Sequence, residues 1–218
     1  MDADGLLDWL RSQLPPGSAA ALRAVGAPGA SLFPAEAALI PRAGDKRRRE
    51  FAAGRAAARA ALLAIGFPPA PLLSYPEGDP VWPAGVVGSI AHSDQWALAV
   101  VAAADRLSGL GVDLESDAPL PPDLAAAICR AEERAASRDL VGGVDAAKLR
   151  FVAKEAFIKA VFPSGRRPIP FEAVSVELMP EGFRARQVDG HESGAGVFRC
   201  ADGLICALCA LSTGPAFR

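Results

Sequence analysis

The sequence predicts an α+β protein made of two halves, each of which runs from helix into antiparallel strands. Two long segments have helical patterns, and each is followed by short apolar runs separated by turn residues. A chain of 218 residues suits one large domain or two small ones of roughly 100 residues each. We place the boundary near Asp105, which gives an N-terminal subdomain of residues 1–105 and a C-terminal subdomain of residues 106–218.

The N-terminal half contains the strongest helical signal, which runs from Asp45 to Ile65 with Asp45 as the N-cap and Gly66 after the last turn. A shorter helix is expected over residues 4–13. The stretch that follows, to about residue 30, is rich in proline and glycine and is expected to be irregular. Residues 67–84 have the same composition and are interpreted as an extended loop.

Three strands are expected in the middle of the chain. The runs VVGSIA and WALAVVAA are separated only by HSDQ, which predicts a β-hairpin. In the next run, GLGVDLE, strict alternation places Leu110, Val112 and Leu114 on one face of a strand. Asp113 and Glu115 then lie on the other face, together with two glycines.

Two helices, over about 121–138 and 145–162, are predicted to follow, the second ending at Pro163. The loop SGRRPIP separates them from an antiparallel meander of four runs, FEAVSVEL, GFRARQV, GVFRC and GLICALCAL. Because WALAVVA faintly resembles LICALCAL, an internal duplication of helix and strands is a further hypothesis.

Composition excludes several classes of protein. The formal net charge is −2, and few aromatic residues accompany the basic ones, so a nucleic-acid partner is not expected. Four cysteines are too few for a disulfide framework in a chain of this length. The start lacks the layout of a signal peptide, and no apolar run approaches the ~18 residues of a membrane span. We therefore expect a soluble, cytoplasmic protein with no membrane partner.

Asp113 and Glu115 are the first candidate functional residues. Hard divalent cations such as Mg²⁺ prefer oxygen ligands and usually retain waters or substrate phosphate oxygens. Two carboxylates on one strand face, with small glycines beside them, allow such a ligand set to approach. The alternative is the polar end of an ordinary strand, and this segment alone does not decide between the two.

The segment FVAKEAFIKA, residues 151–160, supplies a third carboxylate. On a helix, Glu155 and Lys159 lie one turn apart on the same face, and Lys154 is adjacent to Glu155. The simplest interpretation is a surface ion pair worth ~0.3–0.5 kcal/mol. One carboxylate flanked by two ammonium groups would also suit a metal–pyrophosphate group, with the acid on the cation and the lysines on phosphate oxygens.

The helix over residues 45–65 carries a cluster of basic residues at its start. By spacing, Arg48, Arg55 and Arg59 share one helix face and Arg47 lies off it. The alternatives are a solvated helix face and a nucleic-acid patch, and the acidic charge balance argues against the second. His92 lies at the tip of the predicted hairpin, and a lone histidine there does not by itself indicate a function.

The pair Cys206-x-x-Cys209 is compatible with a zinc or redox site. It lies inside an apolar run, with no second ligand pair and no helix N-terminus after it. We therefore expect buried strand cysteines.

The order of four motifs resembles a known family. KRRREFAAGRAAARAAL, PVWPAGVVGSIAHS, GVDLE and FVAKEAFIKA occur in the order found in 4′-phosphopantetheinyl transferases of the Sfp/EntD type, closest to the EntD-like branch that serves siderophore synthetases. The resemblance spans roughly residues 45–162. It implies two similar α/β subdomains with antiparallel sheets related by pseudo-twofold symmetry, and coenzyme A in the cleft between them.

The resemblance also implies roles for individual residues. Asp113, Glu115 and Glu155 match the family's acidic Mg²⁺ ligands, with Mn²⁺ as an alternative metal. Glu155 and Lys159 are the expected catalytic residues, with Glu155 as the base for the serine proton and Lys159 near developing charge. The expected coenzyme A ligands are Arg47, Arg55, His92, Lys154 and Lys159.

Three departures from the family pattern concern this site. Phe151 replaces the commoner tryptophan, and Ser93 follows His92 where cysteine is usual. Ser74 and Tyr75 occupy a neighbourhood in which relatives carry a lysine that reaches the coenzyme phosphates. We therefore expect one phosphate contact to be missing or supplied by another residue.

The reaction implied by the resemblance is transfer of 4′-phosphopantetheine from coenzyme A to a serine of apo acyl carrier protein or peptidyl carrier protein domains, which releases 3′,5′-ADP. A monomer is expected. The alternatives are a non-catalytic module that binds coenzyme A or a nucleotide, and a nucleic-acid-binding protein that uses the basic helix. We expect the carrier protein to contact apolar residues between the two main motifs, namely Leu124, Ile128 and Leu140.

Overall fold

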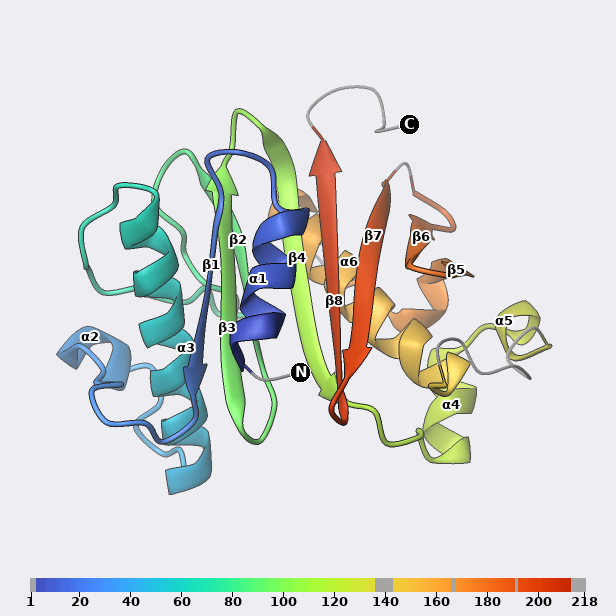
Figure 1. Ribbon diagram of the computed structural model, residues 1–218, viewed down its shortest axis with the longest axis horizontal. Coiled ribbons are helices and arrows are strands. Elements are labelled where there is room, and N and C mark those ends of the chain that lie inside the picture. The colour runs from blue at the N-terminus through green and yellow to red at the C-terminus, as the bar shows by residue number, and fades with distance from the viewer. Residues whose placement is uncertain (1–2, 136–142, 166–167, 191, 213–218) are drawn as a thin grey trace. The chain divides into compact units, whose positions relative to one another are not determined.

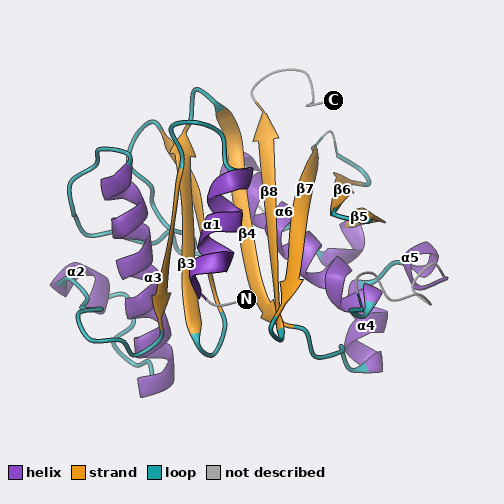
Figure 2. Ribbon diagram, in the orientation of Figure 1, coloured by secondary structure: helices purple, strands orange, loops and turns teal. Residues whose placement is uncertain are grey.

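A computed structural model describes residues 3–135, 143–165, 168–190 and 192–212 (Figure 1). It confirms the α+β class: helices pack on two separate antiparallel sheets (Figure 2). The chain forms two compact units, Met1–Arg106 and Leu107–Arg218. None of the helices in the described ranges combines the length and the apolar character that a membrane span requires.

The first unit contains a three-stranded antiparallel sheet with the strand order β1-β3-β2. Its elements are α1 (Ala3–Gln13), β1 (Ala19–Ala24), α2 (Pro34–Ala37), α3 (Asp45–Ala64), β2 (Val86–His92) and β3 (Trp96–Ala103). The predicted hairpin is confirmed, because β2 pairs with β3 from Val86 opposite Ala103 to His92 opposite Ala97. The core of this unit joins alanines of α3 to strand residues, among them Ala57, Ala61, Ala99 and Val101.

Two details of the first unit differ from the prediction. The irregular stretch before residue 30 contains β1, which pairs along its whole length with β3. Its residues AAALRA include a buried apolar run, and pairing with a central strand outweighs their weak intrinsic preference for β structure. Gly44, rather than Asp45, is the N-cap of α3, so the Asp45 carboxylate lies in the first turn, where the helix dipole favours it.

The second unit contains a five-stranded antiparallel sheet with the strand order β4-β8-β7-β6-β5. Its elements are β4 (Leu107–Ser116), α4 (Pro122–Ile128), α5 (Ala131–Ala135), α6 (Ala146–Gly165), the short 3-10 helix η1 (Phe171–Ala173), β5 (Val174–Met179), β6 (Gly182–Gln187), β7 (Ser193–Ala201) and β8 (Leu204–Ser212). Helix α6 covers one face of this sheet, and its Val152, Ala156 and Phe157 pack against strand residues that include Phe183 and Cys209.

The helix predicted over residues 121–138 is two short helices in the structure, and residues 136–138 lie outside the described ranges. The break falls at Cys129, whose backbone is extended. One long-range and one local hydrogen bond stabilise it: Lys154 Nζ donates to the carbonyl of Ile128, and the Arg130 N–H donates to Glu133 three residues later. The predicted end of the later helix at Pro163 is two residues short of the observed end, Gly165.

Each unit contains a buried glutamate that pairs with a basic side chain of the long helix of that unit. Glu36 in α2 accepts hydrogen bonds from the N–H of Phe33, just before the helix, and from the N–H of Leu72 in the following loop. Arg59 of the long helix α3 pairs with the same carboxylate. In the second unit Glu133 of α5 takes the equivalent place and pairs with a lysine of the long helix α6. A buried carboxylate thus ties each short helix to the long helix of its own unit.

Candidate active site

Helix α6 lies directly against strand β4, because two glycines leave room for it. A Cβ atom on Gly109 would lie 2.1 Å from the carbonyl oxygen of Ala160. A Cβ atom on Gly111 would lie 1.9 Å from the carbonyl oxygen of Ala156. The face of β4 that carries glycine therefore contacts the helix, and the same face carries Asp113, as alternation predicts.

Asp113, Lys159 and Glu155 come together where this strand and helix meet. Lys159 Nζ lies 2.6 Å from Oδ1 of Asp113 and 3.9 Å from Oε2 of Glu155. The Asp113 side chain is almost fully buried, whereas Glu155 and Lys159 are each about one quarter exposed. The pair Glu155–Lys159 is therefore part of a larger cluster, not an isolated pair on a solvated surface.

Glu115 lies two residues farther along β4 and contacts a lysine that the sequence analysis did not single out. Lys148, in the first turn of α6, places Nζ 2.9 Å from Oε2 of Glu115. The same ammonium group lies 5.2 Å from the centre of the Phe151 ring. One signal could have identified it: Lys148 precedes Glu155 by seven residues, which is two helical turns on the same face.

The electrostatics of the cluster follow from burial and from three nearby carboxylates. Burial raises the pKa of Glu155, and the charges of Asp113 and Glu115 raise it further, while Lys159 acts in the opposite direction. For Lys159, burial lowers the pKa, but Asp113, Glu155 and Glu115 outweigh it, so the net shift is upward. Glu155 is thus a stronger base than an ordinary glutamate, and Lys159 stays protonated.

The oxygen atoms of this cluster fit a hard divalent cation. Oδ2 of Asp113 is buried, and no donor in the described part of the chain forms a hydrogen bond with it. Buried carboxylate oxygens without a partner are uncommon, and a metal ion is one group that satisfies them. In the described residues, however, no three His, Cys, Asp or Glu side chains are already arranged as a metal site. Asp113 and Glu115 form ion pairs with lysines instead, so a cation can bind only after these lysine side chains move.

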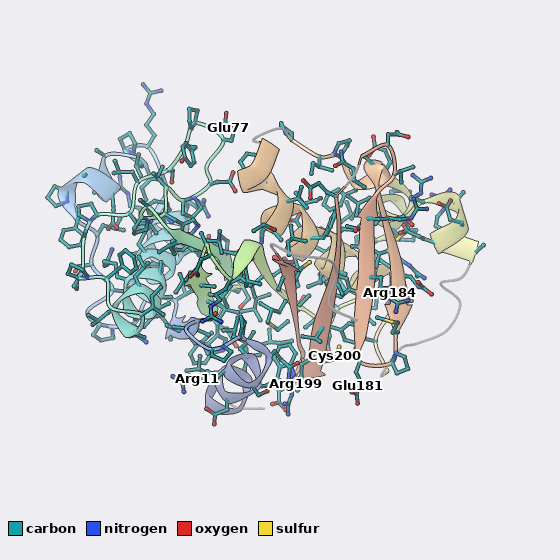
Figure 3. The ribbon with its side chains drawn as sticks, turned by 90° about the horizontal axis from the view of Figure 1, so that it is seen from above. Arg11, Glu77, Glu181, Arg184, Arg199 and Cys200 are labelled. Atoms are coloured by element: carbon teal, nitrogen blue, oxygen red, sulfur yellow. The ribbon has the colours of Figure 1, made fainter. Side chains whose placement is uncertain are left out.

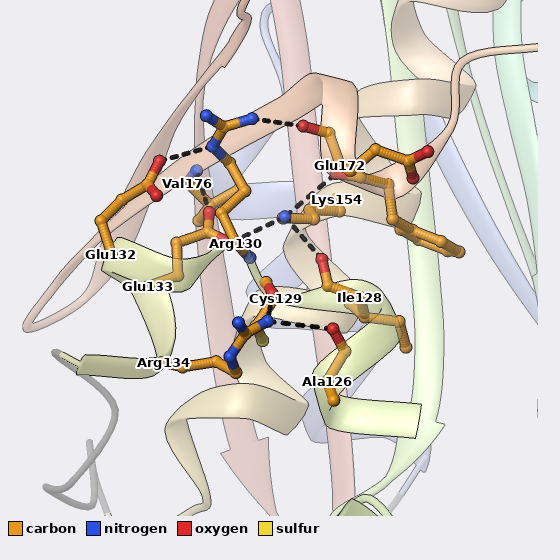
Figure 4. A network of polar contacts seen from close by, with 11 residues as sticks. Ala126, Ile128, Cys129, Arg130, Glu132, Glu133, Arg134, Lys154, Glu172 and Val176 are labelled. Carbon is orange, nitrogen blue, oxygen red and sulfur yellow. Dashed lines mark hydrogen bonds and ion pairs between the residues drawn. The ribbon is translucent and has the colours of Figure 1, made fainter. Parts of the chain in front are cut away.

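Lys154, expected to bind coenzyme A phosphates, lies elsewhere, and this expectation is corrected. Its side chain is 0% exposed and donates three hydrogen bonds: to Oε2 of Glu133 at 2.7 Å, to the carbonyl of Ile128 at 2.8 Å and to the carbonyl of Phe171 at 3.1 Å (Figure 4). An ammonium group has three N–H donors, so all of them are used. Lys154 therefore stabilises the second unit and is not available to a phosphate.

In the first unit, Arg47 of the basic helix contacts His92 of the hairpin, and both side chains are exposed. Arg47 Nη1 lies 3.0 Å from Nε2 of His92, the last residue of β2. Beside them Lys46 forms an ion pair with Asp94 at 2.6 Å. The structure thus brings together two of the residues expected to bind the coenzyme, on the exposed start of α3 and the adjacent end of β2.

Arg55, the third expected ligand in this unit, is 4% exposed. Its Nη2 donates to Oγ of Ser74 at 2.6 Å, and its guanidinium carbon lies 4.3 Å from the centre of the Phe51 ring. Burial, together with the charges of Arg47 and Arg59, lowers the pKa of Arg55 to about 10, although Glu36 acts in the opposite direction. Ser74, noted as a departure from the family pattern, is therefore a direct partner of Arg55.

Arg48 and Arg59 of the basic helix form hydrogen bonds and ion pairs within the first unit. Arg48 donates to the carbonyls of Ala43 and Pro41. Arg59 forms two contacts of 2.7 Å with Glu36. Helix spacing grouped these two with Arg55, but their hydrogen bonds within the first unit give them a structural role. Arg47 is the arginine that contacts His92.

Comparisons with known proteins show which family this chain is similar to. A family model described as the 4′-phosphopantetheinyl transferase N-terminal domain matches residues 35–102, and one described as the 4′-phosphopantetheinyl transferase superfamily matches residues 109–209. The chain is 40% identical over 164 residues to 4′-phosphopantetheinyl transferase Svp of Streptomyces mobaraensis, covering 73% of this chain and 67% of the relative. It is 41% identical over 164 residues to 4′-phosphopantetheinyl transferase PptT of Mycobacterium tuberculosis, covering 74% and 72%.

The chain belongs to the 4′-phosphopantetheinyl transferase family. A shorter match, 42% identical over 78 residues, relates 36% of the chain to 35% of enterobactin synthase component D of Escherichia coli K12. The family resemblance stated from the four motifs is thereby confirmed. The chain is an enzyme of this class, which transfers phosphopantetheine to carrier proteins.

The expected carrier-protein surface of this transferase is only partly available. Leu124 in α4 is 45% exposed, but Ile128 is buried and packs with Cys129 and Ala147. Leu140 lies outside the described residues. Ile128 is therefore part of the core, and of the two described residues only Leu124 can contact a partner.

The four cysteines of the transferase are free thiols. Cys206 and Cys209 are buried in β8, as predicted. Burial raises the pKa of Cys209 to about 12 and shifts the pKa of Cys206 upward as well. Protonated, buried thiols are poor nucleophiles and poor metal ligands, so neither the zinc nor the redox interpretation is supported.

Proposed function

We propose that the chain transfers 4′-phosphopantetheine from coenzyme A to a serine hydroxyl of an apo acyl carrier protein or peptidyl carrier protein, with Mg²⁺ as the metal. The observation that supports this most directly is the cluster of Asp113, Glu115 and Glu155 around Lys159. It combines hard oxygen ligands with a protonated lysine and a carboxylate of raised pKa.

In the proposed reaction, the serine oxygen forms a bond to the β-phosphorus of coenzyme A, and the bond from that phosphorus to the bridging oxygen breaks. The products are the holo carrier protein and 3′,5′-ADP, and the serine proton is released. Phosphoryl transfer leaves little covalent work to the protein, so positioning and charge stabilisation provide the catalysis.

Each residue of the cluster has a role in this scheme. Asp113, Glu115 and Glu155 would hold Mg²⁺, which supplies positive charge next to the pyrophosphate when bound. Glu155 also accepts the serine proton, directly or through a water. Lys159 stays protonated and offsets the negative charge on the leaving 3′,5′-ADP.

The coenzyme ligands of the first unit are Arg47, Arg55 and His92. Arg47 and His92 lie on an exposed surface and can donate to phosphate oxygens. Arg55 is buried, its Nε has no hydrogen-bond partner within the described chain, and no carboxylate forms an ion pair with it there. A phosphate would compensate its charge, which is the reason for retaining it as a ligand.

The decisive test is incubation with coenzyme A, Mg²⁺ and a panel of apo carrier domains that includes those of siderophore synthetases. Transfer gives a mass gain of ~340 Da on the carrier, the mass of the phosphopantetheine group. We expect Asp113→Ala and Glu155→Ala to abolish this gain while both proteins stay folded. Glu177→Ala, on the exposed face of β5, is the matched control and should keep full activity.

Two results would contradict the proposal. Undiminished conversion by either active-site variant would exclude the assigned carboxylates. Coenzyme A binding by the wild type without a mass gain on any carrier would favour the alternative, a non-catalytic module that binds coenzyme A.

A further inference from the structure

Lysine and carboxylate side chains alternate where α6 faces β4. Lys148, Glu155 and Lys159 share one face of the helix, and they lie opposite Glu115 and Asp113 of the strand. Three carboxylates and two ammonium groups leave one net negative charge. A divalent cation would therefore meet less negative charge here than the three acids alone provide.

The two lysines bind the carboxylates differently. Lys159 takes Oδ1 of Asp113, and Oδ2 remains without a hydrogen bond in the described chain. Lys148 is 6% exposed, and the strand carboxylate of Glu115 lies on one side of its ammonium group while the Phe151 ring lies 5.2 Å away. A lysine held between a carboxylate and an aromatic ring is fixed in place by both contacts.

We propose that Lys148 is an internal counter-ion of Glu115, which competes with the divalent cation for this carboxylate and sets the metal affinity of the site. This inference rests on the proposed function, because it takes Glu115 as a metal ligand. Lys148 is a positioning residue: it holds Glu115 against α6 when metal is absent and must leave Oε2 when metal binds there.

Lys148 competes with the cation because both carry positive charge. A divalent cation and an ammonium group on the same carboxylate oxygen would lie within about 4 Å of each other, where two positive charges repel strongly in a partly buried site. Binding therefore includes the cost of moving Lys148 away from Glu115 and from the Phe151 ring. Removal of the lysine charge would eliminate this cost and leave two net negative charges to match the cation.

The test is the affinity of the full-length protein for Mn²⁺ without coenzyme A, measured from the electron paramagnetic resonance signal of free Mn²⁺. Lys148→Met keeps the apolar stem against Phe151 and removes the charge, and we expect it to bind Mn²⁺ about tenfold more tightly than the wild type. Arg184→Gln removes one exposed positive charge from β6 in the same unit (Figure 3) and should change the affinity by less than about twofold.

A second variant and a thermal unfolding measurement distinguish a change in metal affinity from a loss of folding. Lys148→Gln retains a hydrogen-bond donor for Glu115 without the charge, and it should also bind Mn²⁺ more tightly. In metal-free buffer, Lys148→Met should unfold at a lower temperature than the wild type, and added Mn²⁺ should reduce the difference.

The outcomes separate the inference from the proposed function. Mn²⁺ affinity in both Lys148 variants equal to or weaker than that of the wild type overturns the inference and leaves the metal site standing. Mn²⁺ binding that Glu115→Gln and Asp113→Asn do not weaken overturns the metal assignment itself, and the inference with it.

Discussion

Gly111 of β4 lies so close to Ala156 of α6 that a Cβ atom on the glycine would be 1.9 Å from the alanine carbonyl oxygen. No real Cβ approaches a backbone oxygen that closely, so only glycine allows this packing. The close approach of helix and strand places Lys159 within 2.6 Å of Asp113. A backbone contact made possible by two glycines therefore determines the geometry of the carboxylate cluster.

We predict that Gly111→Ala destabilises the protein by about 3 kcal/mol, because the added methyl group must push the backbone of α6 away from β4. The same displacement separates Lys159 from Asp113, so phosphopantetheine transfer should fall more than the folded fraction does. Urea unfolding and the carrier mass assay measure the two effects.

Gly44→Ala is the control for this substitution, since a Cβ at Gly44 would meet no atom within 4 Å. As a change at a helix N-cap, it should cost no more than about 1 kcal/mol. Equal unfolding free energies for Gly111→Ala and Gly44→Ala would show that the β4–α6 contact yields easily and does not fix the cluster.

Sequence patterns predicted the parts of the fold that depend on local periodicity. Alternation in GLGVDLE identified β4 and placed Asp113 on the glycine face, and helical spacing placed Glu155 near Lys159. The hairpin of β2 and β3 followed from two apolar runs with four residues between them. These features are encoded within about ten residues of sequence, where a pattern can be recognised.

Features that depend on distant partners could not be predicted in this way. Strand β1 forms because it pairs with β3, from Ala24 opposite Trp96 to Ala19 opposite Val101. The paired residues are more than seventy positions apart in the sequence. Lys154 and Lys159 look equivalent in the segment FVAKEAFIKA. Only the tertiary structure shows that Lys154 points to Glu133 in the interior whereas Lys159 points to Asp113.

The pH dependence of stability should report the raised pKa of Glu155. A carboxyl group with a higher pKa in the folded chain binds its proton more readily when folded. This contribution to stability is complete below the ordinary pKa of 4.5 and is lost as the pH rises through the raised folded value. Glu155→Gln mimics the protonated form, so in metal-free buffer its melting temperature should match the wild type near pH 4 and exceed it near pH 8.

Differential scanning calorimetry in EDTA at several pH values measures this difference. Glu177→Gln, an exposed change on β5, should differ from the wild type by the same small amount throughout. A gap between Glu155→Gln and the wild type that does not change with pH would contradict the raised pKa.

The cysteines give a prediction about chemical reactivity. Because burial raises the pKa of Cys209 to about 12 and also raises that of Cys206, neither should react with a thiol reagent at pH 8 in the folded protein. All four thiols should react after unfolding in guanidinium chloride. Mass spectrometry of the alkylated native protein identifies the sites, and rapid labelling of Cys206 or Cys209 would refute the buried assignment.

Arg55 provides a test that separates stability from coenzyme binding. Its guanidinium is buried and its pKa is lowered to about 10, which means that burial of the charge is costly in the free protein. Arg55→Met should therefore leave the unfolding free energy almost unchanged, while coenzyme A affinity falls by about tenfold or more. Arg49→Met, on the exposed side of the same helix, should change neither quantity.

Calorimetric titration with coenzyme A and urea unfolding supply the two measurements. If Arg55→Met loses stability and keeps its coenzyme affinity, Arg55 is a structural residue of the first unit and not a ligand.

The Lys154–Glu133 pair leads to the prediction that most directly distinguishes a structural lysine from a phosphate ligand. Lys154→Met leaves the buried carboxylate of Glu133 without its cation and the carbonyl of Ile128 without a donor, which should cost about 3–5 kcal/mol. Adding Glu133→Gln removes the buried charge, and the new amide keeps an acceptor for the N–H of Val176. The double variant should therefore be more stable than Lys154→Met alone. Urea unfolding of the wild type, Lys154→Met, Glu133→Gln and the double variant measures this coupling. A Lys154→Met protein with wild-type stability and weakened coenzyme A binding would instead return Lys154 to the phosphate site.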